Sequence, residues 1–230
     1  MGPVRNALRL FRENVWQVFL VILLFVVPIQ MVYTLAVNYM TLPFQVLGIP
    51  LWPALIKSFF MFIALFLIQL PFISMALQYA RHEDIRLGKT LADAFQPMLS
   101  IYVMSFFVSF LIVTGSLLLI IPGLVLFLLF LGISYAAIID GKTWLQGVKQ
   151  SFAFGSSHFF KLLGLLFVFA VLGLITSFAV LFVLYLVTGF YLILNVSVII
   201  TNSLLFSILF FTISFYYLDW SDGAVGTEVI

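Results

Sequence analysis

Two copies of the tripeptide Gly-Lys-Thr, centred on Lys89 and Lys142, are the first residues whose types suggest chemistry. A nucleotide phosphate-binding loop requires a further glycine five positions before the Gly-Lys pair, between a strand and a helix. Those positions hold Glu83 and Ala136. The sequence therefore predicts no nucleotide binding, and both lysines are better explained as contacts to anionic lipid headgroups.

Catalytic and metal-binding patterns are the next chemistry to consider. His82 and His158 are the only histidines, and neither belongs to a pattern of metal ligands. The chain has no cysteine, which excludes disulfides, thiolate metal sites and cysteine nucleophiles. It contains no G-x-S-x-G or H-E-x-x-H motif. We expect no catalytic residue, no metal, no cofactor and no nucleic-acid partner.

Four amide side chains lie inside strongly apolar runs and could handle a polar ligand: Gln30, Gln69, Asn195 and Asn202. One interpretation is a polar path through a membrane. The other is hydrogen bonding between helices, which amide side chains also provide in lipid. No carboxylate lies inside an apolar run, which argues against an ion-coupled pump.

Composition explains why these amides stand out. Of the 230 residues, 65% are hydrophobic and 8% are charged, and the mean hydropathy is +1.29. Soluble domains carry about 25% charged residues. Lipid is therefore the expected solvent, and we predict an all-α, polytopic membrane bundle that forms one domain over residues 1–230.

Stretches without charge mark the membrane spans, because a charge at the bilayer centre costs about 2.5–3.5 kcal/mol. A spanning helix needs roughly 20 residues. A positively charged start followed by an apolar run can also be a signal peptide, but the first run is too long, so we expect it to be retained. The predicted spans are Val15–Met40, Pro53–Ala80, Met98–Ile121, Pro122–Ile139, Phe159–Val187 and Tyr191–Leu218, with a loop-like apolar stretch after the first.

The longest central run, residues 94–139, contains adjacent Pro122 and Gly123. As one helix it would be about 69 Å long at 1.5 Å per residue, whereas the hydrocarbon core is about 30 Å thick. Proline disfavours helix at the residue before it, and glycine tolerates turn geometry. We predict a hairpin turn at Pro122 and Gly123, in preference to a kink in a single helix.

Basic residues predict the orientation, because they are enriched on the cytoplasmic side. Nine of the ten lie in segments that the six spans place on one side, and Lys57 lies on the other. We expect an inner (cytoplasmic) membrane protein with both termini in the cytoplasm.

Short amphipathic helices are expected in the headgroup layer on the same side. They cover residues 6–14, 87–97 and 140–152, and the last two share the Gly-Lys-Thr tripeptide. This suggests a threefold repeat of an interfacial helix and a membrane hairpin, although chance similarity between apolar segments is the alternative. The residues expected to contact headgroups are Arg9, Arg12, Lys89, Lys142, Trp144 and Lys149.

A stretch of about fifty residues that begins before Pro122 resembles a known pattern. Its elements are Ile-Pro-Gly, an apolar span, Asp140, a short helix that ends in Ser151 and Phe152, and Gly155. It is similar to a family of bacterial six-span membrane proteins and to the membrane domain attached to some glycerophosphodiester phosphodiesterases. The resemblance implies a six-span fold and hints at lipids. Because no phosphodiesterase domain is present, it implies no such activity.

Two functions follow as hypotheses. The first is a non-enzymatic membrane protein that binds lipids or organises a membrane assembly. Its partners would be membrane lipids, including anionic headgroups, and a second copy of the chain or another membrane protein. The second is a transporter or channel for a small or lipidic substrate, with the four amides in the apolar runs lining the path.

Overall fold

The apolar runs form helices, because in lipid a backbone must satisfy its hydrogen bonds within the segment. The computed structural model describes residues 2–227, with side chains through Asp222, so Met1 and the segment 228–230 that includes Glu228 lie outside the described residues. No strand occurs in the described chain. The elements are α1 (Pro3–Glu13), α2 (Val15–Val21), a π-helical segment η1 (Ile22–Val26), α3 (Val27–Val46), α4 (Leu51–Ile68), α5 (Leu70–Ala80), α6 (Leu87–Phe95), α7 (Met98–Leu118), α8 (Ile120–Phe130), α9 (Ile133–Ile139), α10 (Trp144–Ser157), α11 (Phe159–Tyr185) and α12 (Tyr191–Thr227).

Six segments of the described chain are long and apolar enough to cross a membrane, which confirms the predicted all-α bundle. Three of them are built from consecutive shorter helices that continue one another. The segments are Val15–Val46, Leu51–Ala80, Met98–Leu118, Ile120–Ile139, Phe159–Tyr185 and Tyr191–Asp222.

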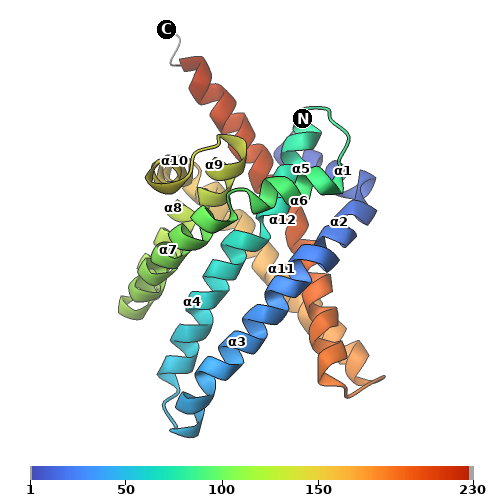
Figure 1. The fold of residues 1–230 in the computed structure, drawn as a ribbon, viewed down its shortest axis with the longest axis vertical. Coiled ribbons are helices and arrows are strands. Elements are labelled where there is room, and N and C mark those ends of the chain that lie inside the picture. Colours follow the sequence, from blue (N-terminus) through green and yellow to red (C-terminus); the bar gives the residue numbers. More distant parts are fainter. Residues whose placement is uncertain (1, 228–230) are drawn as a thin grey trace.

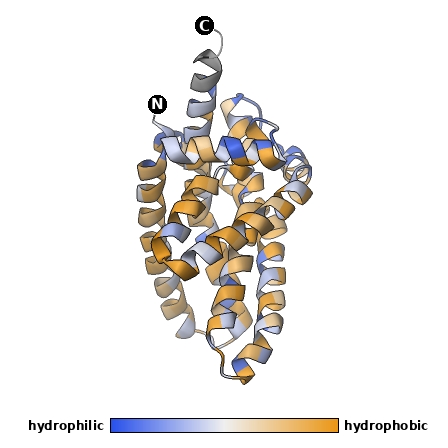
Figure 2. Cartoon of the chain, turned by 90° about the vertical axis from the view of Figure 1, so that its left-hand side faces the viewer, coloured by the Kyte–Doolittle hydropathy of each residue, from blue (hydrophilic) through white to orange (hydrophobic). Residues whose placement is uncertain are grey.

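The segments pair into three helical hairpins whose turns lie at the same end of the bundle (Figure 1). The short helices α1, α6 and α10 lie at the opposite end, and each precedes one hairpin in the chain. Hydrophobic residues cover the long helices, and hydrophilic residues concentrate at the end with the short helices (Figure 2). The element order is thus a short helix followed by a hairpin, three times, while the sequence repeat itself stays a prediction.

The segment formed by α4 and α5 lies at the centre of the bundle. In its most apolar window 72% of the residues are buried, compared with 6% in α11. One buried cluster joins α4 and α5 to α7, α8, α9 and α12, and it contains Phe66, Tyr135 and Tyr217. A second cluster packs Ala7 and Leu10 of α1 against α2, α5 and α12. Helix α1 is therefore anchored by its apolar face, and α11 lies at the periphery.

The loop-like stretch expected after the first span is mostly helical, so that prediction was wrong. Helix α3 continues through Pro43 to Val46, and the connection to α4 spans only residues 47–50. A proline removes one backbone hydrogen bond, but this end of α3 also packs on α4. The rings of Phe44 and Trp52 stack with centroids 5.9 Å apart.

The predicted central hairpin is present, but its turn lies three residues earlier than expected. Leu119 has extended backbone (φ −156°, ψ 143°) between α7 and α8, and Pro122 and Gly123 belong to the first turn of α8. Proline is tolerated there because the first amides of a helix have no intrahelical acceptor. Gly123 serves close packing instead of the turn: a Cβ would lie 1.8 Å from Ser116 Oγ and 2.8 Å from Ser116 N.

Candidate lipid headgroup site

Helix α10 presents a mixed cationic and apolar face to the outside. Leu145, Lys149 and Phe152 follow helical spacing on one face, and all three are exposed. The opposite face is buried and includes Phe154. An exposed apolar stripe with a lysine is the pattern of a helix that lies in the headgroup layer, where the lysine can reach the phosphates.

The buried face of α10 explains the motif that the resemblance singled out. Ser151 Oγ donates a hydrogen bond to Leu129 O over 2.9 Å. A Cβ on Gly155 would lie 2.7 Å from Leu128 O, so only glycine allows α10 to approach α8 this closely. At the start of α10, Thr143 is the N-cap residue, but its side chain makes no capping hydrogen bond.

The six predicted headgroup contacts lie at the short-helix end and are exposed. Three of the cations already have partners. Arg9 Nε donates to Glu13 Oε1 over 2.8 Å, Lys89 pairs with Glu83, and Lys142 Nζ donates to Gln150 Oε1 over 3.2 Å. In the described chain Arg12 and Lys149 make no hydrogen bond or ion pair, so they are the cations most available to a phosphate.

Two of these pairs shift the acidity of their carboxyl groups. The hydrogen bond from Arg9 lowers the pKa of the Glu13 carboxyl, and the hydrogen bond from Lys89 lowers the pKa of Glu83. Both acids therefore stay ionised well below neutral pH and keep neutralising their partners.

Gln69 lies where α4 ends and α5 begins. Its Nε2 donates to Ser134 Oγ over 3.1 Å, and Ser134 Oγ donates to Phe66 O over 2.8 Å. Pro71, near the boundary between α4 and α5, has no backbone N–H to donate. Ser134 of α9 donates to a backbone carbonyl beside this boundary, that of Phe66. The contact joins two membrane segments, which is the role of an interhelical hydrogen bond.

Of the other three amides, Asn195 and Asn202 lie on α12 and Gln30 lies on α3. Asn202 Nδ2 donates to Ser177 Oγ over 2.8 Å and joins α12 to α11. Asn195 Nδ2 donates to Tyr191 OH within α12 over 3.2 Å. Gln30 is half-buried, and its backbone oxygen accepts from Thr34. These hydrogen bonds bring none of the four amides into contact with another.

A buried polar network joins α5 to α6, and the sequence analysis missed it. Ser74 Oγ donates to Asp93 Oδ2 over 2.7 Å. Gln78 Nε2 donates to Ser74 Oγ over 3.1 Å and to Thr90 Oγ1 over 3.0 Å, and Gln78 Oε1 accepts from the Arg86 backbone amide over 3.1 Å. The spacing of Ser74 and Gln78 by four residues was the available signal, because it places both on one helix face.

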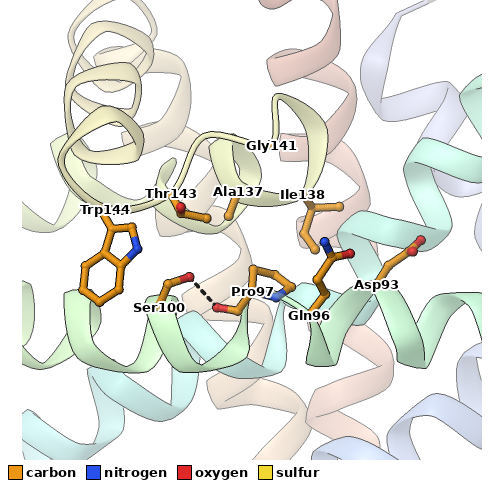
Figure 3. A pocket seen from close by; sticks show the side chains of 9 residues that line it. All are labelled: Asp93, Gln96, Pro97, Ser100, Ala137, Ile138, Gly141, Thr143 and Trp144. Atoms are coloured by element: carbon orange, nitrogen blue, oxygen red, sulfur yellow. Dashed lines mark hydrogen bonds between the residues drawn. The ribbon is translucent and has the colours of Figure 1, made fainter.

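A cavity of about 410 Å³ lies beside this network, between the α6–α7 junction and the α9–α10 connection. Figure 3 shows Gln96, Pro97 and Ser100 on one wall and the α9–α10 residues on the other. The cavity is at the short-helix end of the bundle, where the residues predicted to contact headgroups also lie. It is lined by Asp93, Gln96, Pro97, Ser100, Ala137, Ile138, Gly141, Thr143 and Trp144.

Comparisons with known proteins add no relative to this picture. No protein-family model matches the chain, and neither a curated protein nor a solved structure does. The functional argument therefore rests on the residues and their arrangement.

Proposed function

We propose that this chain is a non-enzymatic integral membrane protein that binds phospholipids, or organises a membrane assembly, at one face of the inner membrane. The observation that supports the proposal is the position of α1, α6 and α10 at the same end of six apolar segments. Their buried faces pack into the bundle, and their exposed faces carry cations. A set of such helices forms a surface for anionic headgroups, with about 1 kcal/mol for each basic residue near the membrane surface.

The same end also carries nine of the ten basic residues, with Lys57 near the opposite end. The enrichment of basic residues in cytoplasmic segments supports a cytoplasmic location for this end and for both termini. We also propose that the segment around Asp140, Ser151 and Gly155 is related to the matching segment of bacterial six-span membrane proteins. It supports lipids as partners and implies no phosphodiesterase activity.

Native mass spectrometry of the full chain, released from vesicles of phosphatidylglycerol and phosphatidylethanolamine, tests lipid binding. The double variant Arg12→Gln/Lys149→Gln should retain several-fold less phosphatidylglycerol than the wild type, because it loses the two predicted headgroup-contacting cations whose side chains make no hydrogen bond or ion pair in the described chain. Lys57→Gln is the matched control, since it removes one exposed cation from the other end. Equal phosphatidylglycerol retention in all three proteins would contradict the proposal.

Transport is the second candidate, and two buried oxygens favour it. Gln69 Oε1 and Asn202 Oδ1 are buried and accept no hydrogen bond in the described chain. Buried amide oxygens without a donor are rare and suit a polar substrate. Against a path, the two residues lie in different helix pairs. Flux into proteoliposomes distinguishes the roles: Asn202→Ala should lose flux with unchanged unfolding in a transporter, and lose stability alone if it only joins helices.

A further inference from the structure

The cavity beside Asp93 has an unusual charge pattern for a site near anionic headgroups. Asp93 is the only charged residue among its lining, and no lysine, arginine or histidine lines it. The ion pairs among residues 2–227 are Arg9–Glu13 and Lys89–Glu83, so Asp93 has no cationic partner within that range. The negative charge of this half-buried carboxylate is therefore not neutralised by a nearby cation of the chain.

The network behind Asp93 fixes its carboxylate. Ser74 donates to one oxygen, and Gln78 holds Ser74. Ser74 and Gln78 are fully or almost fully buried. In the described chain the other oxygen, Asp93 Oδ1, accepts no hydrogen bond, so it is available to a positively charged ligand group.

Three uncharged side chains with free donors also line the cavity. The side chains of Gln96, Thr143 and Trp144 make no hydrogen bond within residues 2–227, so an amide N–H, a hydroxyl and an indole N–H are free to donate. Ser100, by contrast, already donates to Pro97 O over 2.8 Å. Figure 3 shows Asp93 at one end of this row of side chains and Trp144 at the other.

The conformation of Trp144 is a second unusual feature of the cavity. Its φ is +54°, in the left-handed region that costs a bulky residue about 1–2 kcal/mol. Backbone strain of this kind persists only where the surroundings hold it. The indole is half-exposed at the edge of the cavity, at the headgroup level where tryptophan is enriched in membrane proteins.

We propose that this cavity binds the headgroup of a zwitterionic phospholipid with an ammonium group, such as phosphatidylethanolamine. The ammonium lies against Asp93, and the phosphate accepts from Gln96, Thr143 and Trp144. This inference rests on the proposed lipid-binding function and names a second class of lipid, separate from the anionic lipids at the exposed cations. The volume is near the lower end of the range for ligand pockets, about 300–1,000 Å³, so the acyl chains stay in the bilayer.

The charge pattern of the cavity explains why it selects phosphatidylethanolamine over phosphatidylglycerol and over a free amine. Phosphatidylglycerol carries the same phosphate but no cation, so it would leave Asp93 unpaired and place an anion near it. A soluble amine such as ethanolamine satisfies Asp93 but leaves the three donors free. Only a molecule with both groups pairs with Asp93 and with the three donors at once.

The test uses the full chain in nanodiscs that contain phosphatidylethanolamine and phosphatidylglycerol with identical acyl chains. Native mass spectrometry counts each lipid that remains bound after release. The wild type should retain one phosphatidylethanolamine molecule, and Asp93→Asn should lower its retention about tenfold, as expected when a charge-assisted hydrogen bond becomes neutral. Asparagine keeps an oxygen for the Ser74 bond, so the fold is preserved.

Asp219→Asn is the matched control, because Asp219 is an exposed carboxylate on α12 and should not affect retention. Trp144→Leu removes the indole donor and should lower phosphatidylethanolamine retention without changing phosphatidylglycerol retention. Unchanged phosphatidylethanolamine retention in Asp93→Asn would overturn the assignment. So would binding of free ethanolamine by a chain that retains no phosphatidylethanolamine, since the ligand would then be a soluble amine.

Counting the two lipids separately distinguishes a failure of the headgroup cavity from a failure of the proposed cationic surface. Suppose that Arg12→Gln/Lys149→Gln loses phosphatidylglycerol, and that Asp93→Asn retains as much phosphatidylethanolamine as the wild type. This result would support the cationic surface and refute the headgroup cavity. Phosphatidylglycerol retention that does not depend on the cations would instead refute the cationic surface, whatever the cavity binds.

Discussion

Tyr217 donates a hydrogen bond from its hydroxyl to Asp140 Oδ2 over 2.6 Å, across 77 residues of sequence. Asp140 follows α9 and Tyr217 lies on α12, so the bond joins the last segment to the connection that leads into α10. The Tyr217 ring also lies 4.9 Å from the ring of Phe154 on α10, measured between centroids. This relationship holds the amphipathic helix α10 and the neighbouring cavity wall in place.

Tyr217→Phe should lower the free energy of unfolding by about 1.5–3 kcal/mol, the value of a hydrogen bond to a charged group. The ring contacts remain, so the change isolates the hydroxyl. Unfolding in mixed micelles by titration with a denaturing detergent measures the effect. Tyr216→Phe is the control, because in the described chain the Tyr216 hydroxyl makes no hydrogen bond. Equal losses in the two variants would show that the Asp140 bond does not stabilise the bundle.

Gly123→Ala should destabilise the α7–α8 hairpin, because the new Cβ would overlap Ser116 Oγ and crowd the Ser116 backbone. Overpacking of this kind costs about 1–3 kcal/mol or more. Gly164→Ala is the control, since a Cβ there meets no atom within 4 Å, and alanine favours helix over glycine by about 1 kcal/mol. The same unfolding titration should show a loss for the first variant and no loss for the second.

Adding Ser116→Ala to Gly123→Ala should rescue only part of that loss, because the crowding of the Ser116 backbone amide remains. Complete rescue would place the whole conflict in the Ser116 hydroxyl.

Ser134→Ala should remove both hydrogen bonds at the α4–α5 break and leave the buried Gln69 amide without its acceptor. A buried polar group that loses its partner costs about 1–3 kcal/mol. Ser156→Ala is the control, because Ser156 is exposed and bonds within its own helix. If the two serine variants unfolded at the same denaturant concentration, the break would be held by packing alone.

The stability of the protein should fall as the pH is lowered below about 6.5, the ordinary pKa of histidine. Burial, and then the charge of Lys161, lower the pKa of His158 in the folded protein. The unfolded chain therefore binds a proton at a higher pH than the folded chain does, and stability decreases as the pH falls from the unfolded pKa towards the folded one.

Thermal unfolding between pH 8 and pH 5 measures this dependence. His158→Gln should reduce the loss of Tm at acid pH. An identical profile in the wild type and His158→Gln would assign the acid sensitivity to other groups.

The sequence determined the class of fold and the number of spans. Both depend on local properties, namely the length of each apolar run and the cost of placing a charge in lipid. The gap between Asp93 and Asp140 had to contain two spans, because a single helix would far exceed the bilayer thickness. The turn at Leu119 was displaced from the predicted Pro122 and Gly123, since proline is as compatible with the first turn of a helix as with a loop.

Only the tertiary structure decided which polar groups meet. Gln69 and Ser134 are 65 residues apart, and the cavity combines Asp93 with Trp144, the first residue of α10, some fifty residues later. Such pairings depend on the rotation of each helix about its axis and on which helices are neighbours. Small residues at close contacts, such as Gly123 and Gly155, control both, and their role becomes visible only when the atoms opposite them are known.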